Sequence, residues 1–167
     1  MTIQALNHLP EEQLREQLFN CCGSTKWVDL MLKQLPFASH QDILDAAVTQ
    51  WNHCVEPDWR EAFTHHPKIG DVASLTKKFA ATAAWASGEQ QSVQQATATV
   101  IQQLAEGNAA YEEKFGFIFI VCATGKSAEE MLQLLQLRLP NGVETELHIA
   151  QAEQMKITLI RLNKLLA

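Results

Sequence analysis

The chain has 167 residues, which is enough for one domain with a well-covered hydrophobic core. Hydrophobic residues make up 47% of it, a share that is ordinary for a folded protein and argues against disorder. The formal net charge of -6 and the scattered positions of the 13 lysines and arginines argue against nucleic acid as a partner, because no basic stripe exists to neutralise phosphates.

Capping and turn residues divide the chain into predicted helices. Pro10 is followed by two glutamates, which is typical of a first helical turn. Ser39 and Ser127 each stand three positions before an acidic residue, and Ser87 stands three before a glutamine, which is the spacing of a capping box. Apolar residues then recur every three or four positions. The predicted helices cover, in chain order, residues 10–22, 27–34, 39–54, 58–66, 87–115, 127–139 and 144–166.

Two segments do not follow a helical pattern. The segment 71–86 has small residues and no clear period, so we predict a loop with room for a single helical turn. The segment Phe117–Cys122 is aromatic and β-branched, which favours a strand, but no second strand candidate exists to pair with it. It is therefore either a buried extended segment between helices or an apolar helix that overrides its propensity. In either case, backbone groups outside a regular ladder could bind a ligand.

These patterns together predict an all-α fold, a single-domain helical bundle of roughly eight helices over residues 1–167. No apolar run is long enough to span a bilayer, and no basic-then-apolar start indicates secretion. The four cysteines include the adjacent pair Cys21-Cys22 but no CxxC spacing, which argues against a disulfide framework and a structural zinc site. We therefore expect a reduced, soluble, cytoplasmic protein that contacts neither a membrane nor nucleic acid.

The segment His65-His66-Pro67 is the first candidate for chemistry. Histidine is the side chain whose pKa lies nearest neutrality, so it can donate or accept a proton. Pro67 disfavours helical geometry at His66 and would hold its imidazole on a fixed, extended backbone. The alternative is a histidine that merely stabilises the negative end of a helix. Adjacent residues at a helix end point in different directions, so at most one of the pair would face a given cleft.

Three further residues suit an anionic ligand. Glu89 and Gln90 stand in the first turn of a predicted helix, where backbone N–H groups can bind an anion, although an acid and a capping glutamine are also common there. Arg161 projects about 120° away from the apolar stripe of the last helix, so it is either a carboxylate clamp or a solvated arginine. No metal site is expected, because the histidines and Asp71 lack the spacing that places two ligands on one helix face.

The order of several motifs along the chain resembles one known family. The motifs are His66-Pro67-Lys68-Ile69-Gly70-Asp71, Trp85 to Gln90, Asn108-Ala109-Ala110-Tyr111, Phe115-Gly116-Phe117, Arg138-Leu139-Pro140-Asn141, and Glu153 with the run from Ile157 to Leu162. Taken together they resemble the 2-oxo-4-hydroxy-4-carboxy-5-ureidoimidazoline (OHCU) decarboxylases, which form allantoin during urate degradation. The similarity spans nearly the whole chain, and it is the combination of motifs that is specific.

The resemblance implies an all-α, cofactor-free carboxy-lyase that acts as a homodimer on a small ureidoimidazoline and releases (S)-allantoin and CO2. It implies that His66 is the catalytic histidine and that Glu89 is catalytic or orients the substrate. The remaining substrate-binding residues that it implies are Pro67, Ala86, Ser87, Gln90, Phe119, Ile120, Val121, Cys122, Ala123 and Arg161.

The chain departs from the family at one position, and two other classes of protein compete with the decarboxylase. Family members often carry a serine three residues before the glutamate, where this chain has Ala86, although Ser87 is adjacent. A helical interaction module without catalysis would use the same motifs as caps and core. A metalloenzyme is a third alternative. Enantioselective formation of allantoin and metal analysis of the purified protein would separate the three classes.

Overall fold

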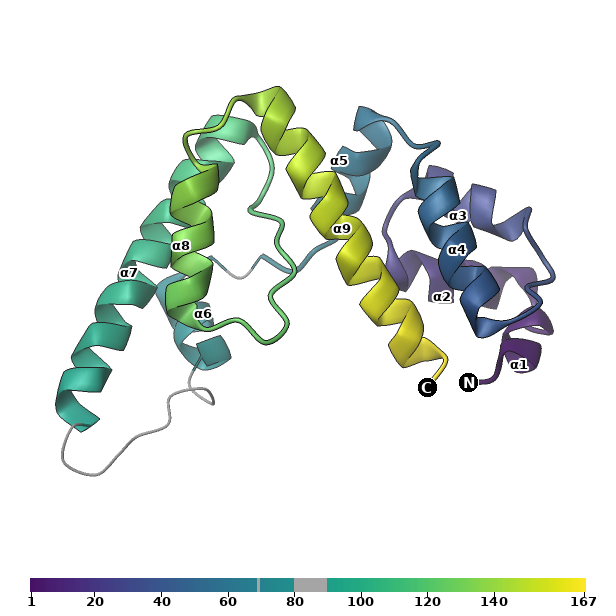
Figure 1. Ribbon diagram of the computed structural model, residues 1–167, viewed down its shortest axis with the longest axis horizontal. Helices are drawn as coiled ribbons and strands as arrows, with labels where there is room; N and C mark the ends of the chain where they lie inside the picture. The colour runs from purple at the N-terminus through teal and green to yellow at the C-terminus, as the bar shows by residue number, and fades with distance from the viewer. Residues whose placement is uncertain (69, 80–89) are drawn as a thin grey trace. The chain divides into compact units, whose positions relative to one another are not determined.

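The computed structural model describes residues 1–68, 70–79 and 90–167, without the side chains of 90–96, and its regular structure in these ranges is entirely helical (Figure 1). The all-α prediction is therefore confirmed, with nine helices in the described ranges where we expected roughly eight. The helices are α1 (Ile3–Asn7), α2 (Glu11–Cys21), α3 (Thr25–Leu32), α4 (His40–Trp51), α5 (Glu56–Thr64), α6 (Val72–Phe79), α7 (Gln90–Phe115), α8 (Ala128–Arg138) and α9 (Val143–Leu165).

Side-chain caps begin two of the helices where the sequence predicts them. The hydroxyl of Ser39 accepts a hydrogen bond from the backbone N–H of Asp42 at 3.1 Å, and Ser127 accepts one from Glu130 at 3.2 Å. Each bond satisfies one of the N–H groups that the first turn of a helix leaves without an intrahelical partner. The predicted cap at Ser87 lies outside the described residues.

The structure corrects the prediction for residues 71–86 and decides the one for Phe117–Cys122. Val72–Phe79 forms the two-turn helix α6, whose buried Leu75 and Phe79 lie four residues apart on one face. The rest of that predicted loop lies outside the described residues. Phe117–Cys122 is neither helix nor strand, so the apolar-helix alternative is wrong and the segment links α7 to α8 as irregular, largely buried chain.

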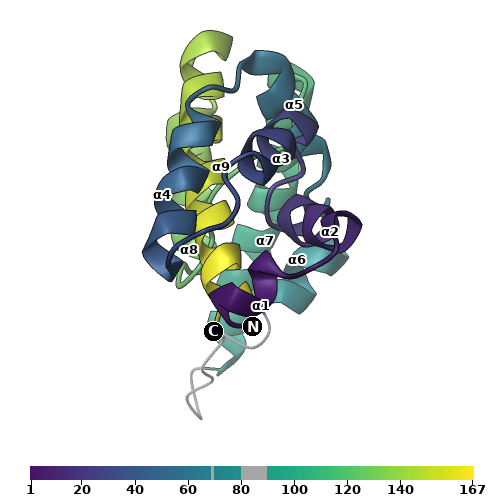
Figure 2. The same ribbon diagram turned by 90° about the vertical axis from the view of Figure 1, so that its right-hand side faces the viewer.

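The chain divides into two compact units, which we describe separately. The first unit comprises residues 1–66, 120–122 and 147–167. In it, α3 packs against α2, α4 and α5 (Figure 2), and two buried indoles donate to backbone oxygens, Trp27 to Ala47 and Trp51 to Gln151, each at 3.1 Å. The buried core of this unit contains Leu6, Leu14, Leu18, Cys21, Cys22, Trp27, Val28, Met31, Phe37, Ile43, Ala47, Trp51, Cys54, Ala62, Met155 and Leu162.

The second unit comprises residues 67–119 and 123–146, and it is built around the long helix α7. Helices α6 and α8 each pack against α7. Gly107 permits a close approach to α8, because a Cβ atom at this position would lie 2.5 Å from Cδ2 of Leu135. The prediction of a single domain over residues 1–167 stays a prediction.

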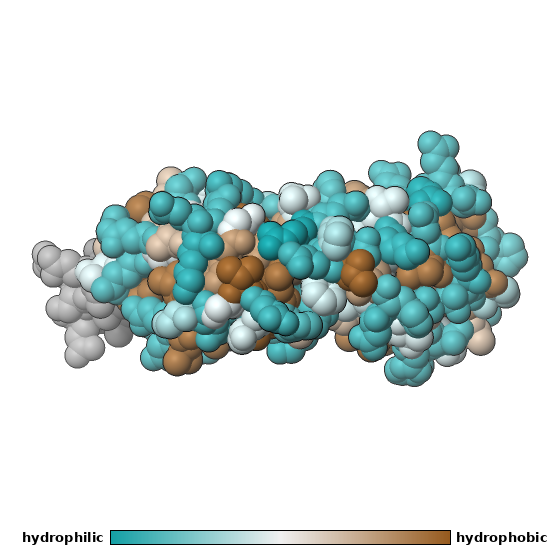
Figure 3. Space-filling view, turned by 90° about the horizontal axis from the view of Figure 1, so that it is seen from above, coloured by the Kyte–Doolittle hydropathy of each residue, from teal (hydrophilic) through white to brown (hydrophobic). Residues whose placement is uncertain are grey.

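The face of the molecule that Figure 3 shows is mainly polar. Seen from above, it carries mostly hydrophilic side chains, with apolar groups in small patches between them (Figure 3). Within the described ranges, every helix is too short or too polar to cross a bilayer.

Candidate functional site

The two adjacent histidines at the end of α5 have different surroundings. Helix α5 ends at Thr64, and Pro67 follows the pair. The His65 ring packs edge-on against Phe19, with ring centroids 4.8 Å apart, and it covers Gly23, where a Cβ atom would lie 2.5 Å from the Cβ of His65. The neighbouring His66 is partly buried and contacts a different helix, α9. The two rings are therefore separated, as expected for adjacent residues at a helix end.

A chain of two polar side chains on α9 holds His66. Its Nε2 atom lies 2.5 Å from Oε1 of Gln154. The Nε2 atom of Gln154 donates to the hydroxyl of Thr158 at 3.2 Å, and that hydroxyl donates to the backbone oxygen of Gln154 at 3.0 Å. Both Gln154 and Thr158 are 0% exposed. This is a buried polar chain whose one titratable member is His66.

The surroundings of His66 favour its neutral form. Burial lowers the pKa of the imidazole below its ordinary value of 6.5, because a charge loses hydration there. The hydrogen bond to Gln154 acts in the opposite direction, and the nearby charges of Arg161 and His65 lower the pKa further. A neutral imidazole at neutral pH can accept a proton from a substrate.

Arg161 and the segment Ile120–Cys122 belong to the same unit as His66. Arg161 lies seven residues after Gln154, so Gln154, Thr158 and Arg161 share one face of α9. Arg161 is partly buried, and its Nη1 donates to the backbone oxygen of Cys21 at 3.3 Å. The backbone N–H of Cys122 donates to Oε1 of Glu153 at 3.3 Å, which ties the irregular segment to α9.

The remaining predicted site residues fall elsewhere. Pro67, Phe119 and Ala123 belong to the second unit, where Pro67 is exposed and the other two are partly buried. Gln90 begins α7, but its side chain lies outside the described residues, and so do Ala86, Ser87 and Glu89. The structure thus groups His66 with Arg161 and the segment Ile120–Cys122 in one unit.

Gln154 and Thr158 were not among the predicted site residues, and Glu153 had no predicted role. A signal for the first two was present. On α9 the buried positions include Leu147, Ala150 and Leu162, and Gln154 and Thr158 continue this stripe at helical spacing. A polar residue on an apolar stripe requires a partner, because burying an unsatisfied amide or hydroxyl is costly. Two such residues four positions apart indicate a buried polar interaction.

The second unit contains a buried polar cluster of its own, which consists of Tyr111, Arg138, Asn141 and Glu146. The carboxylate of Glu146 accepts hydrogen bonds from the Tyr111 hydroxyl and from Arg138 Nε, both at 2.5 Å, and from Asn141 at 3.1 Å. Burial raises the pKa of Tyr111 above its ordinary value of 10.0, and the neighbouring Glu146 raises it further. The guanidinium of Arg138 also lies 4.6 Å from the ring centroid of Phe119.

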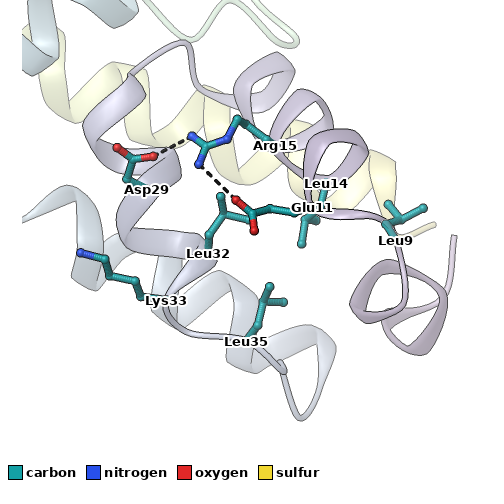
Figure 4. A pocket seen from close by; sticks show the side chains of 8 residues that line it. All are labelled: Leu9, Glu11, Leu14, Arg15, Asp29, Leu32, Lys33 and Leu35. Carbon is teal, nitrogen blue, oxygen red and sulfur yellow. Dashed lines mark hydrogen bonds and ion pairs between the residues drawn. The ribbon is translucent and has the colours of Figure 1, made fainter.

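An open depression of about 420 Å³ lies on the first unit (Figure 4). Its rim carries Arg15, which forms ion pairs with Asp29 at 2.6 Å and Glu11 at 3.6 Å. None of the predicted site residues that the structure describes lines it. Within the described ranges, no three His, Cys, Asp or Glu side chains come together in a way that could hold a metal ion.

Comparison with known proteins gives consistent matches. The family model described as OHCU decarboxylase matches residues 7–163. The uric acid degradation bifunctional protein TTL of Arabidopsis thaliana is 42% identical over 149 residues, which cover 87% of this chain and 45% of that protein. The 2-oxo-4-hydroxy-4-carboxy-5-ureidoimidazoline decarboxylase of Amia calva is 32% identical over 137 residues, which cover 78% of this chain and 74% of that protein.

Solved structures agree with these matches. The crystal structure of an OHCU decarboxylase in the presence of (S)-allantoin superposes with a TM-score of 0.71 at 36% identity, and the match covers 95% of this chain and 99% of that one. An (S)-allantoin synthase structure has the same TM-score at 16% identity, covering 98% of this chain and 54% of that one, and shows the shared fold alone. The chain spans less than half the length of the two bifunctional relatives that it matches.

Proposed function

This chain belongs to the OHCU decarboxylase family, and we propose that it converts 2-oxo-4-hydroxy-4-carboxy-5-ureidoimidazoline to (S)-allantoin and CO2. The observation that carries the proposal is the family match over residues 7–163, which leaves only short ends of the chain outside it. The partly buried histidine beside Arg161 supports the proposal, because a base and a cation suit a substrate that carries a hydroxyl and a carboxylate.

The reaction needs no external oxidant or reductant. The bond between the ring carbon and the carboxylate breaks, CO2 leaves, and the electron pair of that bond stays on the electron-accepting ring. The ring takes up one proton overall, and delivery of this proton to one face gives a single enantiomer. The protein therefore has to position the carboxylate, stabilise the developing negative charge and control one proton.

In this proposal His66 is the acid/base and Glu89 orients the substrate. A neutral His66 takes the proton of the substrate hydroxyl or returns it to the ring. Arg161 holds an anionic or ureido group, and Gln90 hydrogen-bonds the substrate. Further contacts come from Pro67, Ala86, Ser87 and the run Phe119, Ile120, Val121, Cys122 and Ala123, whose irregular backbone offers N–H and C=O groups.

We also propose that the protein works as a cytoplasmic homodimer and that its chemistry is cofactor-independent. The resemblance of the chain to the family supports these assignments. Analytical ultracentrifugation at micromolar concentration gives the oligomeric state directly, and activity that persists after dialysis against a chelator supports cofactor independence.

The test is stereospecific allantoin formation from freshly generated OHCU, followed by circular dichroism at the absorption of allantoin. We expect the wild-type protein to accelerate formation of the (S)-enantiomer over spontaneous decay. His66→Ala and Glu89→Ala should each lower kcat about 10²-fold or more, which is the range for loss of a general acid or base. His40→Ala, which changes an exposed histidine, is the matched control and should retain wild-type turnover.

Two results would contradict the proposal. If the wild-type protein gave racemic allantoin at the spontaneous rate, a non-catalytic interaction module would be favoured instead. Near-normal turnover of folded His66→Ala would remove His66 from the mechanism, whatever the activity of the wild type.

A further inference from the structure

We infer that Gln154 is a positioning residue that fixes the neutral tautomer of His66, with the proton on Nε2 and the lone pair on Nδ1. It follows that Nδ1 is the nitrogen that exchanges a proton with the substrate. This second statement rests on the proposed function, whereas the tautomer itself can be observed without any substrate.

The orientation of the Gln154 amide follows from its second partner. Thr158 donates its single hydroxyl proton to the backbone oxygen of Gln154 at 3.0 Å, so its lone pairs are left to accept a hydrogen bond. The Gln154 Nε2 atom supplies that bond at 3.2 Å. The nitrogen end of the amide therefore faces Thr158, and the oxygen end faces His66.

An amide oxygen can only accept a hydrogen bond, so Nε2 of a neutral His66 must be the protonated nitrogen. The 2.5 Å separation is that of a close contact, and Gln154 is 0% exposed, so bulk water does not compete for it. Among the described residues, none forms a hydrogen bond to Nδ1 of His66. The second ring nitrogen is thus the one that is left with its lone pair.

A second amide–histidine pair, in which the amide again belongs to α9, provides a comparison inside the molecule. The Nε2 atom of His40 lies 2.8 Å from Oδ1 of Asn163, also on α9, but both residues are exposed. Water can replace the Asn163 amide at His40, whereas the buried Gln154 cannot be replaced in this way at His66. The same chemical pair should therefore restrain His66 strongly and His40 weakly.

The first measurement is ¹⁵N NMR of the histidine side chains in the full-length protein, with His66→Gln used to assign the His66 signals. Above the pKa, we expect His66 in the wild type to show a protonated Nε2 and an unprotonated Nδ1. Gln154→Met, which keeps a similar length but accepts no strong hydrogen bond, should give a mixture of tautomers. A wild-type His66 that is protonated on Nδ1, or a tautomer that stays unchanged in folded Gln154→Met, would overturn the inference.

The second measurement is the pKa of His66 in a series at position 154. Gln154→Glu places a carboxylate beside the ring and should raise the pKa by about 1 to 3 pH units, because an opposite charge at this distance favours the imidazolium. Gln154→Met should lower it, since the bond to Gln154 favours the charged form. Among the described residues, the titratable groups that act on the ring in every variant are Arg161 on α9 and the neighbouring His65, and both remain unchanged.

Asn163→Asp is the matched control for this series. It creates the same kind of carboxylate–histidine pair at the exposed His40, so it should leave the pKa of His66 unchanged. The pH profile of kcat/KM should move with the pKa of His66 in the position-154 variants and stay fixed in Asn163→Asp. A purely structural Gln154 would lower stability without moving the profile, and that outcome would refute the positioning role.

Failure of this inference can be distinguished from failure of the proposed function. If the tautomer and the pKa series hold but the wild-type protein forms no allantoin, the decarboxylase proposal fails and the tautomer assignment stands. If the wild type forms allantoin and the tautomer does not depend on position 154, the tautomer assignment fails and the decarboxylase proposal stands.

Discussion

Two buried polar clusters among the described residues are built on opposite principles. The cluster of Tyr111, Arg138 and Glu146 in the second unit pairs full charges, and Glu146 is 0% exposed and Arg138 is 7% exposed. The chain of His66, Gln154 and Thr158 in the first unit contains no permanent charge. The charged cluster is also closed, because both carboxylate oxygens of Glu146 accept hydrogen bonds. The neutral chain ends at a ring whose second nitrogen remains for other chemistry.

From this difference we expect the charged cluster to be structural and the chain that holds His66 to take part in proton transfer. A buried ion pair gives little net stability relative to an apolar core, but it becomes very costly when one partner is removed. Burying a neutral histidine costs less free energy than burying a charged side chain. The pKa of such a histidine depends on each neighbour, so a small change in its surroundings alters its protonation state. Three predictions test this contrast, and they are given in order of decreasing size.

The largest effect is expected from Glu146→Ala in the charged cluster. The guanidinium of Arg138 would stay buried without its carboxylate, which should lower the free energy of unfolding by about 3 to 5 kcal/mol. Urea denaturation followed by far-UV circular dichroism measures this loss. The double variant Arg138→Met with Glu146→Leu removes both charges together and should recover part of the stability. A double variant that is less stable than Glu146→Ala would mean that the cluster is not held by this charge pair.

A smaller, pH-dependent effect is expected at His66. Its pKa in the folded protein lies below the ordinary value of 6.5, so between these two values the unfolded chain binds a proton that the folded protein does not. The stability that the neutral ring contributes is therefore complete above pH 6.5, and it decreases as the pH falls towards the folded-state pKa. Denaturation of the wild type and His66→Gln across this window should show a steeper loss for the wild type, while parallel curves would contradict the lowered pKa.

The smallest effect is expected for Asp29→Asn at the rim of the open depression. The ion pair between Asp29 and Arg15 is short, but both side chains are nearly half exposed, so water screens it and the gain is small. We expect a melting temperature within experimental error of the wild type at physiological salt. A loss comparable to that of Glu146→Ala would show that exposure does not separate the two kinds of ion pair.

Local chemistry explains which parts of the fold the sequence predicts well. The caps at Ser39 and Ser127 depend on side chains three residues from the backbone groups that they bind, so the signal lies within one helical turn. Helix α6 was predicted as no more than a single turn, although Val72, Leu75 and Phe79 recur in it at helical spacing, because small residues dominate the rest of the stretch 71–86. Its burial against α7 is a tertiary contact, which local propensity does not register.

In the candidate site, too, some residues can be predicted from local sequence and others only from the fold. His66 could be proposed as a site residue because its type and its proline neighbour are visible in the sequence. Its partner Gln154 is 88 residues away along the chain, and glutamine on a long helix usually has no special role. Only the fold shows that Gln154 is buried and bonded to the ring. The roles of Glu89 and Gln90 stay predictions, since the side chains concerned lie outside the described residues.

The bare backbone at Gly23 has a consequence for how the first unit can evolve. The turn between α2 and α3 fits beneath the His65 ring only because position 23 has no side chain. Any other residue there would displace His65, and the peptide bond would pass part of that displacement to His66. A Cβ atom at Gly142, by contrast, would meet no neighbouring atom within 4 Å, so that turn can accept substitution. Mutational tolerance is thus distributed unevenly between two glycine-containing connections, and the intolerant one is coupled through His65 to His66.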